Sequence, residues 1–281
     1  MKIKSIVLLL VALFLFKNIN AQLSAVGFKS DEFATFKGSK TYCLKTGNQK
    51  YDEAIASAMS ESWKITPFEF VSEVDLKVKI KDKSASFLCP ILIGEPNHGY
   101  HYLALFNGGR KSVSNYAYDD LVAYSPINKF VDEAELTDCS WRIRNMIESM
   151  VLGLEIVQKN NIDGNSLKMV NQLRDYYNKK SPQIKSRTLL ISETSMGYKF
   201  KKSDIPAVYP FKVEVCPRSK IEKAINDKSK DYYYLQPGIT LNKSIFVIDP
   251  SNGEVLYFNY DTMGLNVTKK NVEEMVETIK K

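Results

Sequence analysis

Two histidines and a glutamate lie within seven residues of one another and form the most localised candidate for metal chemistry in the chain. They are Glu95, His98 and His101, and the 281-residue sequence contains no other histidine. Imidazole and carboxylate groups are suitable ligands for zinc and similar cations. However, Pro96 and Gly99 interrupt this stretch and predict a polar loop that leads into a strand. Because no fourth ligand is evident, we expect neither a metal nor a cofactor, and the three residues remain the alternative site.

Sequence motifs for nucleophilic catalysis are missing. The chain has neither the G-x-S-x-G turn of serine hydrolases nor a serine followed three positions later by lysine. Its 32 acidic residues are compatible with a hydrolase that uses scattered carboxylates, since such pairs meet in space and leave no linear signature. We therefore expect a non-catalytic binding role, and a secreted hydrolase or metal-dependent enzyme is the alternative.

Four cysteines are spread widely along the chain: Cys43, Cys89, Cys139 and Cys216. The closest two are 46 residues apart, so no C-x-x-C motif for redox or zinc chemistry exists. Four cysteines permit three complete pairings, and spacing does not select among them. Three of them lie in apolar runs typical of strands, which favours buried free thiols.

Tyrosine is abundant, with 16 copies, and three of them are consecutive at Tyr232, Tyr233 and Tyr234. Alternate residues of a strand face opposite sides, so at least one of these rings is expected to face away from the core. An exposed tyrosine surface suits a protein or glycan partner, because the ring buries apolar area while its hydroxyl forms hydrogen bonds. The alternative interpretation is cross-strand packing within the sheet.

The first 21 residues have the composition of an export signal. Lys2 and Lys4 precede an apolar core of 11 residues, and the stretch ends in a small residue, Ala21. This core is too short to span a bilayer, and no later stretch is longer, so we expect no membrane span in the mature chain. Removal of the signal lowers the formal charge from +7 to +4. Export to the periplasm or beyond the cell also argues against nucleic acid as a partner.

An internal repeat organises the rest of the chain. Four short segments recur in the same order in both halves: Ser39–Thr41 with Ser186–Thr188, Pro67 with Pro210, Asp82 with Asp227, and Phe87–Pro90 with Tyr234–Pro237. The spacing from proline to aspartate is 15 residues in the first half and 17 in the second. Such self-similarity predicts one structural unit used twice. After a lead-in segment at 22–38, we expect copies at 39–160 and 186–281, each burying its own core, with a connecting helix and linker at 161–185.

The repeat also decides an ambiguous local pattern. Between residues 74 and 80 apolar and charged residues alternate, which by itself predicts a strand. The matching segment at 219–225 has helical spacing, so we predict a helix in both places, with Ser72 as the N-cap of the first. Longer helices are predicted at 138–160 and 166–179, and Asp249–Gly253 is predicted to be a hairpin turn.

Each copy then contains strand, helix, strand, helix, antiparallel strands and helix, which predicts an α/β fold with a mixed sheet in each lobe. One continuous α+β domain is the alternative. The final hairpin and helix, about the last forty residues, resemble the end of a thioredoxin-like fold in element order alone. The redox cysteine pair of that fold is missing, so the resemblance implies no activity. We expect binding to use the groove between the lobes or a tyrosine-bearing sheet face.

Overall fold

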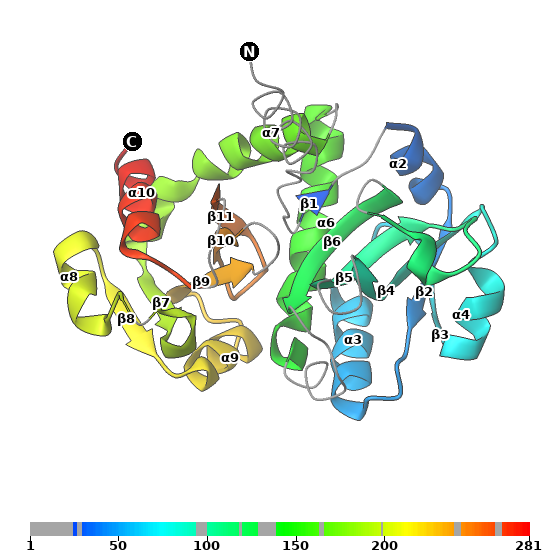
Figure 1. Cartoon of the computed structure of the whole chain (residues 1–281), viewed down its shortest axis with the longest axis horizontal. Coiled ribbons are helices and arrows are strands. Elements are labelled where there is room, and N and C mark those ends of the chain that lie inside the picture. Colours follow the sequence, from blue (N-terminus) through cyan, green and yellow to red (C-terminus); the bar gives the residue numbers. More distant parts are fainter. Residues whose placement is uncertain are drawn as a thin grey trace, which may run out of the picture.

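Two mixed β-sheets with helices packed on them form the two lobes that the internal repeat predicts (Figure 1). This computed structural model describes residues 25–26, 30–93, 100–117, 120–128, 139–162, 166–197, 199–238, 243–261 and 266–281. The fold is the α/β arrangement expected from the sequence. The predicted export signal lies outside the described residues.

In the described residues, the first sheet has six strands in the order β1-β6-β5-β4-β2-β3. Their bounds are β1 (Ala25–Val26), β2 (Lys40–Leu44), β3 (Phe68–Val71), β4 (Ala85–Ile93), β5 (Tyr100–Asn107) and β6 (Leu121–Asn128). Strand β2 is parallel to β3 and β4, and the other neighbours are antiparallel. The two-residue strand β1 comes from the lead-in segment, so the first copy itself contributes five strands.

The second sheet has the order β11-β10-β9-β7-β8. Its strands are β7 (Thr188–Ser192), β8 (Val213–Cys216), β9 (Tyr232–Gly238), β10 (Lys243–Ile248) and β11 (Val255–Asp261). Strand β7 is parallel to β8 and β9, and β10 is antiparallel to both of its neighbours. Strand for strand, this matches the order and direction of β6-β5-β4-β2-β3, which confirms the repeat at the level of topology.

The register of the strands tests the individual sequence matches. In the first sheet Thr41 pairs with Phe68 and Ser86, and in the second Leu189 pairs with Val213 and Tyr233. Thr41 and Leu189 are equivalent, because each donates its N–H to the residue before its partner on the neighbouring strand, Pro67 and Lys212. Phe68 is then equivalent to Val213, and Ser86 to Tyr233. The segments Phe87–Pro90 and Tyr234–Pro237 are therefore equivalent in space, as their sequences predict.

Of the other three matches, one is in register and two are displaced by one or two residues. Asp82 and Asp227 each lie 14 residues after the equivalent strand positions Phe68 and Val213, so they are in register. Pro210 lies two residues before the position equivalent to Pro67, which accounts for the longer proline-to-aspartate spacing of the second copy. The match of Ser39–Thr41 with Ser186–Thr188 is shifted by one residue.

The described helices are α2 (Ser30–Lys37), α3 (Gln49–Ser62), α4 (Glu73–Lys79), α6 (Ile143–Asn160), α7 (Ser166–Asn178), α8 (Ile205–Val208), α9 (Arg218–Asn226) and α10 (Lys269–Lys280). The two copies differ most between their first two strands. In the first copy α3 connects them with 14 residues, whereas the second has short 3₁₀ turns and the four-residue helix α8.

Helix α4 confirms the prediction that the repeat favoured over the alternating pattern. The Ser72 hydroxyl and the Asp75 carboxylate form a capping box at its start, which satisfies backbone N–H groups of the first turn. Leu76 and Ile80 lie one turn apart and are buried, whereas Val74 and Val78 face solvent with 73% and 71% exposure. The alternation in sequence therefore arises from two opposite faces of a helix.

Helix α6 lies in the middle of the molecule, between the two sheets (Figure 1). Its apolar residues belong to one buried cluster that includes side chains of α3 and the first sheet together with Leu190, Tyr234 and Phe246 of the second sheet. A separate cluster, which includes Val247 and Met275, lies within the second lobe. The expectation that each copy buries its own core is therefore wrong for the first copy, because α6 fills the space between both sheets.

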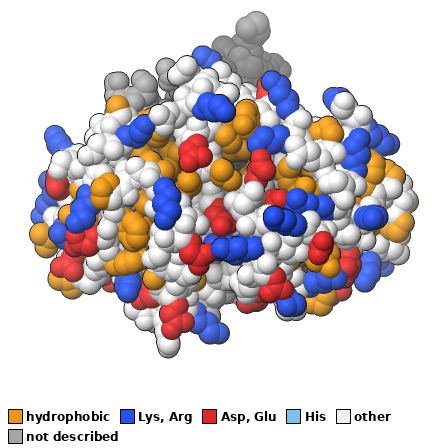
Figure 2. Space-filling model, turned by 180° about the vertical axis from the view of Figure 1, so that it is seen from behind, with side chains coloured by type: hydrophobic (Ala, Val, Ile, Leu, Met, Phe, Trp, Pro, Cys, Tyr) orange, Lys and Arg blue, Asp and Glu red, His pale blue; other side chains and the backbone are white. Residues whose placement is uncertain are grey.

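The surface carries no dominant charge on the face that Figure 2 shows, where Lys and Arg side chains are interspersed with Asp and Glu. Val74 and Val78 are the exposed large hydrophobic residues of the described chain. Within the same residues, every helix is too short or too polar to cross a bilayer.

Candidate functional site

The histidine segment is only partly described. His101 lies on β5 beside Leu92 of β4 and Asn128 of β6, whereas Glu95 and His98 lie outside the described residues. Burial lowers the pKa of His101, and its Nδ1 atom has no hydrogen-bond partner among the described residues. No group of three or more metal-ligating His, Cys, Asp or Glu side chains occurs in the described part of the chain.

All four cysteines are free and buried. Cys43, Cys89 and Cys216 lie on β2, β4 and β8. Desolvation raises the pKa of each of these three thiols, so they stay protonated at neutral pH and are poor nucleophiles. The structure therefore agrees with the interpretation of these cysteines as packing residues.

The three consecutive tyrosines have different environments. Tyr233 is buried in the core of the second lobe, with the guanidinium of Arg187 4.5 Å from its ring centroid. Tyr234 is buried on the opposite side of the sheet, where its hydroxyl donates to Asn145 Oδ1 at 3.1 Å. Tyr232 is half-buried, packs against the first core cluster and has the Lys220 ammonium group 5.4 Å from its ring centroid, so it is the most accessible member of the trio.

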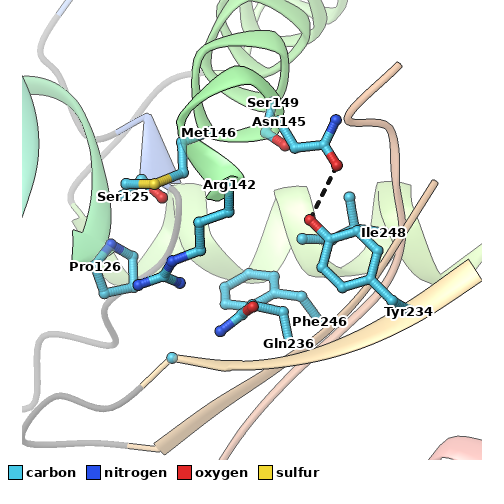
Figure 3. Close-up of a pocket in the computed structure, with 11 residues that line it drawn as sticks. Ser125, Pro126, Arg142, Asn145, Met146, Ser149, Tyr234, Gln236, Phe246 and Ile248 are labelled. Carbon is cyan, nitrogen blue, oxygen red and sulfur yellow. Dashed lines mark hydrogen bonds between the residues drawn. The ribbon is translucent and has the colours of Figure 1, made fainter. Parts of the chain in front are cut away.

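Described residues of both lobes line a small cleft between α6 and the two sheets (Figure 3). It is lined by residues of β6, α6 and the turn before it, β9 and β10: Ser125, Pro126, Arg142, Asn145, Met146, Ser149, Tyr234, Gln236, Gly238, Phe246 and Ile248. Its volume of about 20 Å³ is enough for one water molecule. In this conformation the cleft does not admit a small-molecule ligand.

Polar contacts beside this cleft join helix α6 to the hairpin turn between β10 and β11. Asn145 Nδ2 and Arg144 Nη2 both donate to the carbonyl oxygen of Pro250, at 3.3 and 2.6 Å. Ser149 Oγ donates to the Gly253 carbonyl at 2.5 Å. Asn145 also donates to Glu148 at 2.7 Å, and burial raises the pKa of that carboxyl group. These contacts therefore have a structural role, and together they are called the joint between α6 and the turn.

A second hollow, of about 190 Å³, lies between α6, α7 and the same turn. Leu152, Ile156 and Tyr176 give it a half-buried apolar floor. The Lys180 ammonium group lies 4.9 Å from the Tyr176 ring centroid and forms an ion pair with Glu254. This pairing neutralises the cation nearest the aromatic ring, and the other charged residues of the lining are Glu155 and Lys159.

The third hollow, here called the α9 groove, is the most voluminous of the three, with about 560 Å³. It is lined by residues of α9, the following loop and the start of β9: Lys220, Lys223, Ala224, Asp227, Lys228, Ser229, Lys230, Asp231 and Tyr232. This volume falls within the usual range for ligand-binding pockets. Tyr232, the half-buried tyrosine of the trio, thus lies in the most voluminous of these three hollows.

Three of the four lysines that line the α9 groove form exposed ion pairs. Lys220 donates to both carboxylate oxygens of Glu214 at 2.7 and 2.6 Å, and this hydrogen bonding raises the pKa of the lysine. Lys223 pairs with Asp227 at 2.7 Å. Lys230 makes no ion pair with any residue that the structure describes. Because exposed pairs contribute little stability, these ammonium groups can exchange partners.

Sequence reasoning identified Tyr232 but missed the groove around it. Lys220 and Lys223 lie three residues apart on one helix, and Lys228 and Lys230 follow in the next loop. That clustering before the tyrosine trio was the available signal. No family model, curated protein or solved structure matches this chain.

Proposed function

We propose that the protein is an exported, non-catalytic binding protein that contacts a glycan through the α9 groove. The observation that supports this role is the placement of the half-buried Tyr232 in a hollow of about 560 Å³ rimmed by lysines. An aromatic ring covers the apolar face of a sugar, while ammonium groups donate hydrogen bonds to its oxygens.

A glycan suits this groove better than a protein partner does. Protein interfaces usually bury an apolar centre within a polar rim. The exposed large hydrophobic residues of the described chain, Val74 and Val78, lie on α4 of the first lobe and do not line the groove. Around Tyr232 the lining is mostly charged or hydroxyl-bearing, which matches a partner that is itself highly polar.

The binding role is tested by calorimetric titration of the purified chain with soluble acidic and neutral glycans. We expect Tyr232→Ala to weaken binding about tenfold or more, the usual effect of removing an aromatic anchor. Tyr42→Ala is the matched control, because Tyr42 is also half-buried in a strand, with a lysine ammonium 4.5 Å from its ring centroid, but lies outside the groove.

Three results would contradict the proposal. One is that no glycan of the panel binds, and another is that both tyrosine variants weaken binding equally. The third is that the glycan is shortened during incubation, which mass analysis of the recovered ligand detects and which would indicate a hydrolase.

A metal-dependent enzyme is a second candidate, favoured by the buried His101 Nδ1 atom that lacks a partner among the described residues. This candidate predicts that the purified chain contains bound metal and that His98→Ala removes it. Elemental analysis of both proteins after dialysis decides the matter, because equal and negligible metal content in the two would refute it.

A further inference from the structure

Lys228 has an unusual backbone conformation for its residue type. Its φ angle is 50°, in the left-handed region that glycine adopts most readily. Lys228 N donates to Ile225 O at 3.1 Å, and Ser229 N donates to Ala224 O at 2.9 Å. These two bonds form the Schellman arrangement that closes a helix, in which glycine usually occupies the left-handed position. A lysine therefore costs conformational free energy at the end of α9 that glycine would not.

The contact that Lys228 makes does not by itself account for this cost. Its ammonium group pairs with Glu61 Oε2 of α3, in the other lobe, at 2.8 Å. Both side chains are about half exposed, at 53% and 45%, and ion pairs of this kind contribute little to stability. Lys228 also lines the α9 groove, next to Lys230 and Tyr232. A lysine in this strained position points to a role in binding.

We propose that the α9 groove binds an acidic polysaccharide and that Lys228 presents its ammonium group to a carboxylate or sulfate of that ligand. This inference rests on the glycan-binding role proposed above and adds the chemical class of the ligand. The incoming anion takes the place of Glu61 as the partner of Lys228. Because the Glu61 pair is exposed, the exchange costs little.

The distribution of charge supports an extended anionic ligand. Four lysines line the groove against two aspartates. Three of these lysines are in exposed ion pairs, Lys220 with Glu214, Lys223 with Asp227 and Lys228 with Glu61, and such pairs exchange for a ligand anion at little cost. Lys220 and Lys223 lie on the helix, whereas Lys228 and Lys230 lie on the loop that follows it. Cations supplied by both the helix and the loop suit a chain with repeated negative groups, which contacts several of them together with the Tyr232 ring.

The decisive variant is Lys228→Gly, which separates stability from binding. We expect a higher melting temperature, because glycine accepts the left-handed conformation without strain. We expect binding of polygalacturonate or dextran sulfate to weaken about tenfold, the loss of one charge-assisted hydrogen bond. The matched control is Asn161→Gly, at the other described non-glycine residue with positive φ, 49°, at the end of α6. It should leave binding unchanged.

Glu61→Gln gives the opposite test, because it releases Lys228 from its competing partner. We expect this variant to bind the acidic polymer up to about fivefold more tightly, which corresponds to the small free energy of an exposed pair. The two polymers distinguish a carboxylate from a sulfate as the favoured anion. Neutral dextran and inorganic polyphosphate complete the panel, and we expect both to bind more weakly than the favoured acidic polysaccharide.

The outcomes separate this inference from the broader proposal. If neutral dextran binds best, or if Lys228→Gly leaves affinity unchanged while Tyr232→Ala weakens it, the acidic ligand class is wrong and the glycan groove stands. If polyphosphate binds best, the groove recognises anionic charge without a sugar, and the glycan role is wrong as well. Weaker binding by Glu61→Gln would equally refute the exchange of partners at Lys228. If Tyr232→Ala has no effect on any polymer, the groove itself is wrong.

Discussion

Helices α6 and α10 occupy equivalent places in the two copies, since each follows the last strand of its sheet, yet their surroundings differ. The apolar side chains of α10 belong to one cluster within the second lobe. Those of α6 belong to a cluster that includes both sheets. In Figure 1 α10 lies at the outer edge of the molecule and α6 lies at its centre. The same unit therefore supplies an internal layer in one copy and a terminal layer in the other.

The sequences of the two helices reflect this difference. The outer side of α10 carries ion pairs one turn apart, Lys269 with Glu273 and Lys270 with Glu274. Helix α6 instead carries two buried polar residues one turn apart, Asn145 and Ser149, which are 1% and 5% exposed and are called its polar stripe. Buried polar groups need partners, and the turn of the second lobe provides them through backbone carbonyl groups. The polar contacts of α6 thus connect the two lobes, whereas those of α10, from Ser181 and Asn259 to Thr278 and Glu274, stay within the second copy and the segment that precedes it.

The largest expected effect comes from placing a charge on the side of α6 that faces the second sheet. Met146 lines the cleft between the lobes and is 6% exposed. We expect Met146→Asp to lower the free energy of unfolding by about 3–5 kcal/mol, because an unpaired carboxylate would be buried. Urea denaturation measures this change. Glu277→Asp, on the exposed side of α10, is the control and should shift stability by less than about 0.5 kcal/mol.

A methyl group at Gly253 tests how closely the turn approaches α6. Gly253 has φ 72°, and an added Cβ would lie 2.6 Å from Glu148 Cβ and 2.9 Å from the Asn145 carbonyl oxygen. We expect Gly253→Ala to cost about 2–4 kcal/mol, from backbone strain together with overpacking. Gly47 also has positive φ, 86°, but nothing lies within 4 Å of its added Cβ. Gly47→Ala should therefore show the strain alone, about 1–2 kcal/mol, and equal losses would refute the close contact.

The hydroxyl of Tyr234 distinguishes the two copies at an equivalent strand position, since its counterpart in the first sheet is Phe87. Tyr234→Phe removes the hydrogen bond to Asn145, and we expect a loss of about 1 kcal/mol. Tyr209→Phe is the control, because its buried hydroxyl has no partner in the described structure, and it should be neutral or stabilising. Thermal unfolding of both variants provides the measurement.

Much of this architecture follows from the sequence through the repeat. The helix at α4 was predicted against its local alternation because the matching segment, α9, has helical spacing. The hairpin turn was predicted from Asp249–Gly253, since such residues adopt tight turns readily. These features depend on local chemistry, which neighbouring residues determine.

The position of α6 and the α9 groove were not predictable in this way. The apolar face of α6 is evident in the sequence, but a hydrophobic pattern does not specify whether one sheet or two will cover it. Lys228 and Glu61 meet although 167 residues separate them. Contacts of this kind depend on how the lobes pack against each other, and a single sequence contains no direct record of that packing.

The smallest expected effect concerns the pH dependence of the joint. Burial raises the pKa of Glu148 above its ordinary value of 4.5, although Arg144, whose Nε lies 3.4 Å from the carboxylate, opposes the shift. The folded state therefore binds the proton more tightly than the unfolded chain does. The stability from this proton is fully present below pH 4.5 and is lost as the pH rises through the raised pKa. Glu148→Gln removes this dependence, so the variant should gain stability relative to the parent between pH 4 and 7.

Glu61 provides the internal control, because its pKa is lowered by the hydrogen bond from Lys228. Its contribution has the opposite sign: the stability is present above the unfolded pKa and is lost on acidification through the folded value. Urea denaturation compares Glu61→Gln with the parent below about pH 4.5 and Glu148→Gln with the parent above it, and as the pH rises the two differences should change in opposite directions. Differences that change in the same direction would show that Glu148 is hydrated in solution, and that the polar stripe of α6 is more open than its contacts with the turn indicate.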